Sequence, residues 1–142
     1  MKISSYDYSD LRLKAGDSFV GQSGETYFCE ESVVDESKRI VFCRTLPNGV
    51  VFKMLAFTDY LGMFLAPEHK AWTIYLDDEV VANGVDETKK IKDARLRALA
   101  DTLIGDLLVR AKEDKAARQA ANREHWADKE AKKREALKKL DQ

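Results

Sequence analysis

The feature that most constrains the fold of this chain is an abrupt change of sequence pattern after Gly84. From Asp86 to Leu140 there is no proline and only one glycine, Gly105, among Ala, Leu, Lys, Arg and Glu. Because proline breaks helices and glycine weakens them, this composition predicts one continuous helix. At about 1.5 Å per residue the helix would be roughly 80 Å long, so its second half is expected to project beyond a small domain.

Before Gly84 the pattern is that of β-structure. Short runs of β-branched and aromatic residues alternate with turn residues, which is typical of an antiparallel meander or a small barrel. The turn signals are Gly21-Gln22-Ser23-Gly24, Leu46-Pro47-Asn48-Gly49 and Asp77-Asp78. The expected strands cover residues 17–21, 26–34, 39–45, 50–57, 71–76 and 79–82. One helical turn is expected over residues 60–65, ended by Pro67.

Apolar residues divide the expected helix into two parts. In the first part they recur at intervals of three and four residues, which predicts a stripe that packs on the β domain. From Arg110 onward alanine replaces nearly all the large apolar residues. We therefore expect a β domain over residues 1–84, a packed helix over 85–109 and a solvated helical arm over 110–142, called the arm below. The stripe consists of Leu96, Leu99, Ala100, Leu103, Ile104, Leu107 and Leu108.

Charge follows the same division. The whole chain has 24 basic and 25 acidic residues, and this balance argues against nucleic-acid binding by the entire surface. Residues 1–109 carry 13 basic and 18 acidic residues, a net charge of -5, whereas the arm carries 11 basic and 7 acidic residues, a net charge of +4. Any binding to a polyanion is therefore expected to be local to the arm.

No catalytic or metal-binding motif is present at a diagnostic spacing, so we expect no enzyme activity and no cofactor or metal. The two histidines, His69 and His125, lack a Cys or His partner at ligand spacing. Cys29 and Cys43 are expected to be buried, reduced and structural, with a cross-strand disulfide as the alternative. A third hypothesis, an enzyme with a carboxylate site, requires several of Asp77, Asp78, Glu79 and His69 in one pocket.

The N-terminus has no apolar run after Lys2, and no stretch approaches the roughly 18 apolar residues that cross a bilayer. The sequence therefore predicts a cytoplasmic protein that is not inserted in a membrane.

The strand lengths, the Asn48-Gly49 hairpin and the helical turn before a late strand resemble SH3-like and Tudor-like small barrels. The resemblance covers residues 11–84 and involves the fold pattern alone, so it implies no ligand. Together these features predict an α+β protein, with a small antiparallel sheet or a partly closed barrel followed by one long C-terminal helix.

The predicted function is binding. The preferred hypothesis is a non-catalytic regulatory or adaptor protein that binds a larger protein or nucleoprotein assembly, with the arm as a main interface. The alternative is direct nucleic-acid binding by the basic arm and exposed aromatics. Because the arm has few large residues for a coiled coil, we expect a monomer or weak dimer. The candidate partner-binding residues are Trp126, Arg118, Arg123, Lys129, Lys132, Lys133 and Arg134 on the arm, and Tyr60 and Trp72 before it.

Overall fold

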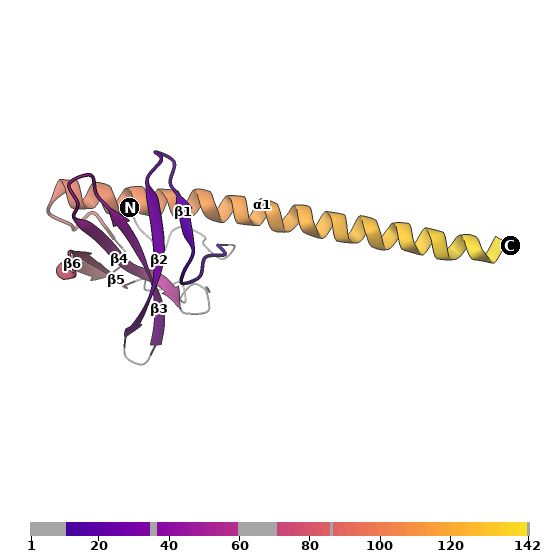
Figure 1. The fold of residues 1–142 in the computed structure, drawn as a ribbon, viewed down its shortest axis with the longest axis horizontal. Helices are drawn as coiled ribbons and strands as arrows, with labels where there is room; N and C mark the ends of the chain where they lie inside the picture. Colours follow the sequence, from indigo (N-terminus) through magenta and orange to yellow (C-terminus); the bar gives the residue numbers. More distant parts are fainter. Residues whose placement is uncertain (1–10, 35–36, 60–70, 86, 142) are drawn as a thin grey trace.

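The structure, a computed structural model, describes residues 11–34, 37–59, 71–85 and 87–141. It has the expected α+β class, with a six-stranded antiparallel sheet followed by one long helix (Figure 1). The strands are β1 (Ser18–Val20), β2 (Thr26–Val34), β3 (Ser37–Thr45), β4 (Val51–Asp59), β5 (Ala71–Leu76) and β6 (Glu79–Val85). The helix α1 (Ala94–Lys138) ends in a short 3-10 helix, η2 (Lys139–Asp141).

The sheet is a simple meander in which each strand pairs with its neighbours in sequence, in the order β1-β2-β3-β4-β5-β6. Among the described residues the two outer strands, β1 and β6, do not pair with each other, so the sheet is open. The six strands lie where the sequence pattern predicts them. Closure into an SH3-like or Tudor-like barrel is not confirmed, and the expected helical turn over residues 60–65 lies outside the described residues.

Each of the three predicted turns is present, with backbone conformations that the residue types explain. Gly24 and Gly49 have φ values of 85° and 87°, in the left-handed region that glycine enters without steric cost. Asn48 does not share this conformation, and its side chain instead accepts a hydrogen bond from the Val50 N–H at 3.1 Å. Asp77 and Asp78 both have positive φ, which fits a two-residue hairpin between β5 and β6.

The helix begins later than the sequence pattern predicted. Asp86 lies outside the described residues, and the residue that caps α1 is Asp93, whose carboxylate accepts hydrogen bonds from the Arg95 and Leu96 N–H groups. The preceding segment is held by its own contacts: the Thr88 hydroxyl donates to Asp101 at 2.6 Å, and Ile91 is buried in the core. These contacts compete with helix formation, which explains the later start.

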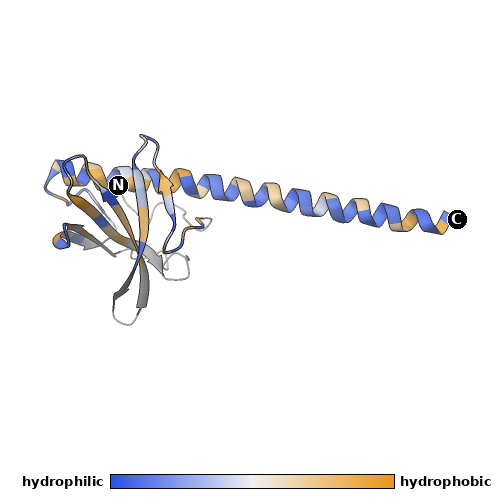
Figure 2. Cartoon of the chain, in the orientation of Figure 1, coloured by the Kyte–Doolittle hydropathy of each residue, from blue (hydrophilic) through white to orange (hydrophobic). Residues whose placement is uncertain are grey.

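The core lies between one face of the sheet and the first half of α1. The strands contribute alternate residues to it, because neighbouring side chains of a strand point to opposite faces. The helix contributes Leu96, Ala100, Leu103, Ile104, Leu107 and Ala111. Figure 2 shows this change along α1, where the apolar colour of the packed half gives way to a largely hydrophilic arm. The buried residues from the strands are Phe19, Tyr27, Cys29, Ile40, Phe42, Phe52, Met54, Trp72 and Ile74.

One acidic residue lies inside this apolar contact. Asp106 is only 4% exposed, and it accepts hydrogen bonds from the Tyr27 hydroxyl and the Gln22 N–H, each at 3.0 Å. Gly21 has no side chain there because a Cβ atom would collide with the carboxylates of Asp106 and Glu25. The β1–β2 turn and the helix are therefore joined by a polar contact at the edge of the core.

The Asp106 carboxylate also changes the titration of its neighbours. A hydrogen bond with Asp106 raises the pKa of Glu25 above its ordinary value of 4.5, with burial as the next cause and Arg44 opposing the shift. Burial and the same carboxylate raise the pKa of Tyr27, so its hydroxyl remains a hydrogen-bond donor. In the folded protein the Glu25 carboxyl therefore stays protonated to a higher pH than an exposed glutamate does.

The packing of α1 on the sheet can be tested by substituting Leu103. Its side chain is fully buried, as its position in the apolar stripe predicted. We expect Leu103→Ala to lower the free energy of unfolding by about 2–5 kcal/mol through lost burial and the cavity left behind. Urea denaturation would measure this, and a loss below about 0.5 kcal/mol would contradict the packing described here.

Glu25 gives a pH-dependent prediction. Because folding raises its pKa, its stabilising contribution is complete below about pH 4.5 and is lost as the pH rises through the higher folded value. Glu25→Gln keeps a hydrogen-bond donor without the charge, so it should stabilise the protein at pH 7, and less at pH 4.5.

Urea denaturation at the two pH values measures this difference. Glu31→Gln, which removes the same charge from an exposed position on β2, serves as the control. A Glu25→Gln effect that is identical at both pH values would show that folding does not raise the pKa of Glu25.

Candidate interaction surface

The arm separates from the rest of the molecule soon after it begins. Ala111 is still buried, and the Asp114 carboxylate accepts a hydrogen bond from the Arg12 N–H at 2.8 Å and pairs with Arg110 at 3.0 Å. Every residue from Lys115 to Asp141 is exposed. The first turn of the arm therefore belongs to the packed structure, and the remainder projects away from the sheet (Figure 1).

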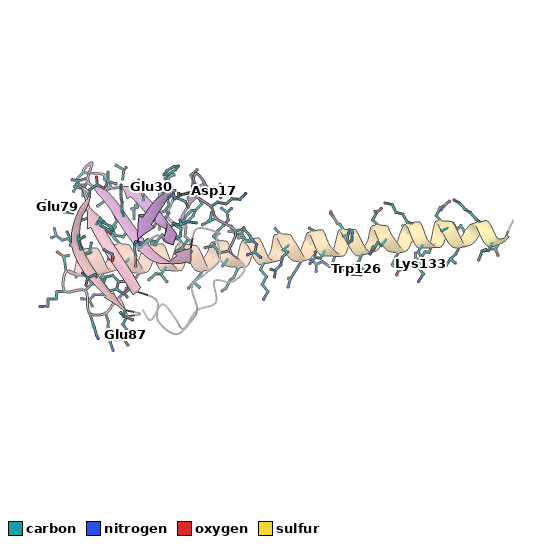
Figure 3. The ribbon with its side chains drawn as sticks, turned by 90° about the horizontal axis from the view of Figure 1, so that it is seen from below. Asp17, Glu30, Glu79, Glu87, Trp126 and Lys133 are labelled. Atoms are coloured by element: carbon teal, nitrogen blue, oxygen red, sulfur yellow. The ribbon has the colours of Figure 1, made fainter. Side chains whose placement is uncertain are left out.

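The regular helix fixes which arm residues share a face. Successive residues of an α-helix are rotated by about 100°, so residues seven and fourteen positions apart lie on nearly the same side. Applied from Trp126, this rule gathers seven basic residues within about 80° of the Trp126 direction. We call this surface the basic face; its residues are Lys112, Lys115, Arg118, Arg123, Lys129, Lys133 and Arg134. Figure 3 labels Trp126 and Lys133 on the arm, well away from the sheet.

The acidic residues of the arm lie mainly on the other side. Of the acidic residues of the arm that lie in α1, Glu130 alone falls on the basic face, and Asp141 lies beyond α1 in η2. The others are rotated by at least about 120° from Trp126, and they are Glu113, Asp114, Glu124, Asp128 and Glu135. Asp114 and Asp128 are engaged locally, Asp128 by Lys132 at 3.2 Å. The arm therefore has a strongly positive face, although its net charge is only +4.

Trp126 is the one large aromatic residue of this face. Its side chain is 62% exposed. The Lys129 ammonium lies over its ring, 5.0 Å from the centroid, and the His125 ring meets it edge-on with a centroid separation of 6.1 Å. The indole is thus held among cationic and polar groups, with much of its surface open to a partner.

The candidate residues outside the arm are not part of this surface. Trp72 is 3% exposed, and its indole packs so closely on Gly84 that a Cβ there would come within 2.6 Å of it. Trp72, named as a candidate partner-binding residue, is therefore covered, because it points to the core face of β5. Tyr60 lies outside the described residues. Lys132 is on the arm but points away from the basic face and pairs with Asp128.

A second polar cluster lies on the opposite face of the sheet from α1. Lys53 pairs with Glu30 at 3.2 Å and with Asp78 at 3.0 Å, and the Cys43 thiol donates to Glu30 at 3.2 Å. The hydrogen bond to Asp78 is the main cause of the raised pKa of Lys53, which keeps its ammonium protonated. Burial and Glu30 raise the pKa of Cys43 to about 12, so the thiol is not activated. Asp78 of the acidic turn therefore belongs to an ion-pair network, and Asp77 accepts a hydrogen bond from the Val51 N–H at 2.9 Å.

The two cysteines occupy opposite sides of the sheet. In the register of β2 and β3, Phe28 is opposite Cys43 and Cys29 is opposite Phe42, so Cys29 points to the core and Cys43 to the other face. Both are free and buried, as predicted. Burial raises the pKa of Cys29 to about 12 as well. The described residues contain no group of three or more His, Cys, Asp or Glu that could bind a metal ion.

One apolar groove was not anticipated from the sequence. It has a volume of about 430 Å³ and lies where the β3–β4 turn and β6 approach the start of α1. Its apolar walls include Leu46 from the β3–β4 turn, Val81 from β6 and Leu99 from α1. The strands and the helix meet there only after folding, so no local motif could reveal it.

The contrast between the two tryptophans can be tested directly. Because Trp126 is exposed and Trp72 is buried, acrylamide should quench mainly the fluorescence of Trp126. Trp126→Phe should therefore remove most of the quenchable emission of the native protein, measured by steady-state fluorescence. Trp72→Phe is the matched control, and strong quenching that remains in the Trp126→Phe variant would contradict the burial of Trp72.

No helix in the described part of the chain has the length and apolar character needed to span a membrane. Comparison of the chain with known protein families, with curated proteins and with solved structures found no match in any of the three. In the described part of the chain, the arm from Lys115 to Asp141 is a long helical surface that is exposed throughout.

Proposed function

We propose that this protein is a non-catalytic regulatory or adaptor protein that binds a larger protein or nucleoprotein assembly through its arm. The observation that carries the proposal is the exposure of the helix from Lys115 to its end, although the same helix is firmly packed up to Ala111. Isolated solvated helices gain little stability from burial, so a long exposed extension is best explained as a surface for another molecule.

The body supports this role by fixing the direction of the arm. Asp106 connects the helix to Tyr27 and to the β1–β2 turn, and Asp114 connects it to the backbone at Arg12. Because both contacts precede the exposed segment, a partner meets a surface that is already oriented. Preorganisation of this kind reduces the entropy lost on binding.

The charged clusters of the body support a non-catalytic reading. The Lys53 ammonium pairs with the carboxylates of both Glu30 and Asp78. The nearby Cys43 remains a thiol because its pKa is raised. A protonated lysine and a protonated cysteine are poor nucleophiles. We further propose a cytoplasmic location, where buried thiols such as Cys29 and Cys43 remain reduced.

Truncation separates binding from folding. A chain ending after Asp114 retains all the buried helical residues and the contact with Arg12. We expect its free energy of unfolding to change by less than about 1 kcal/mol, because the residues removed are exposed. Capture of the partner assembly from a native extract, measured by quantitative mass spectrometry, should nevertheless be lost.

The single change Trp126→Ala should weaken the same capture by the equivalent of about 2 kcal/mol if the indole is buried at the interface. Glu124→Ala, on the opposite side of the arm, is the matched control and should leave capture nearly unchanged. If truncation leaves capture intact, the partner surface lies on the β domain and the proposal is wrong.

A further inference from the structure

The basic face allows the kind of partner to be inferred, an inference that rests on the proposed function of the arm. Its seven cations span the distance from Lys112 to Arg134, about 33 Å along the helix. Glu130 is the one carboxylate among them in the described helix. This segregation of charge is not apparent from the net charge of the arm, and it provides a continuous positive surface that complements a polyanion.

A protein groove is a poor match for this face. A tryptophan anchor at a protein interface is normally surrounded by residues that exclude water. The neighbours of Trp126 one turn away on its face are Asn122, Arg123, Lys129 and Glu130, all of them polar or charged. Lysine is also depleted at the centres of protein interfaces, whereas it is common in contacts with phosphate.

A second copy of the chain is also disfavoured. The residues that would form a two-helix seam with Trp126 recur at alternating intervals of three and four, and they include Lys112, Lys115, Lys129 and Lys133. In a parallel pair each lysine would face its own copy, and in an antiparallel pair Lys112 and Lys115 would face Lys129 and Lys133. Repulsion between like charges opposes both arrangements.

We propose that the basic face binds single-stranded nucleic acid, with the lysines and arginines contacting phosphates and Trp126 stacking on an unpaired base. Cationic surfaces with a central aromatic residue suit single strands, because every unpaired base offers a flat face for stacking. In a duplex the faces of the bases are covered by their neighbours. The exposed indole therefore favours a single strand over a double helix.

The test uses the full chain and a fluorescently labelled single-stranded oligonucleotide of mixed sequence and about 20 nucleotides, with its duplex as a second ligand. Binding is followed by fluorescence anisotropy at 50 mM and 200 mM salt. If about five phosphates are contacted, affinity for the single strand should fall roughly 100-fold between these concentrations. Trp126→Ala should weaken binding at least fivefold, since stacking on an aromatic side chain contributes that much or more.

Two triple variants distinguish a specific face from overall charge. Lys112→Glu, Lys115→Glu and Lys133→Glu together change the basic face, and Lys132→Glu, Lys138→Glu and Lys139→Glu together change the charge equally on other sides of the arm. The first variant should bind at least tenfold more weakly, and the second less than threefold. Circular dichroism confirms that both retain their helix.

Equal losses in the two triple variants would show that binding follows net charge and would overturn the proposal. Tighter binding of the duplex would overturn the stacking of Trp126 on an unpaired base. If no oligonucleotide binds at 50 mM salt while arm-dependent capture survives nuclease treatment, the partner is a protein, and the proposed function stands without this inference. If truncation does not change capture at all, the proposed function itself fails.

Discussion

The whole structure depends on the contact between one apolar stripe of α1 and the core face of the sheet. Leu96, Ala100, Leu103, Leu107 and Ala111 follow one another at intervals of three and four residues, so all of them meet the same layer of strand residues. An open meander has an uncovered face that cannot be stable in water by itself, and the helix supplies its cover. The sheet in turn stabilises the first half of the helix, because most helical stability in proteins comes from packing of an apolar face.

Polar contacts then determine the position and rotation of α1 on the sheet. An apolar stripe alone allows a helix to slide or rotate with little loss of burial, because the hydrophobic effect has no direction. Asp106 requires hydrogen-bond donors at one place, and Tyr27 and the Gln22 N–H provide them. Asp114 adds a second fixed point at Arg12. The packing therefore supplies most of the stability, and the two carboxylates specify the register.

Much of this architecture could be predicted from the sequence because it depends on local patterns. The strands follow from runs of β-branched residues and from the turns at Gly24, Gly49 and Asp77-Asp78, and the packed half of α1 follows from its periodicity. The start of the helix was missed because Thr88 and Ile91 make tertiary contacts that no local rule reports. Trp72 was misjudged for a similar reason, since alternation in a strand does not tell which face is covered.

The candidate surface was partly predictable. Trp126 and five residues of the basic face were candidates from the sequence, whereas Lys112 and Lys115 were not among them. A count of charges along the arm does not show that Glu124 and Lys133 lie on different sides. Once the helix is known to be regular, the same residues separate onto different sides. The only indication of Asp106 in the sequence is that it is an acidic residue within the apolar stripe of the helix. Its partners come from a distant turn, so they could not be identified in advance.

The unbroken backbone of α1 has a mechanical consequence. A rod clamped at one end acts as a lever, and the segment from Lys115 to Lys138 is about 36 Å long. A tilt of about 10° at the clamp would carry the tip through roughly 6 Å, about the spacing of one helical turn. The hydrogen bonds of Asp106, which lie close to the clamped end, therefore also fix where the far end of the helix lies.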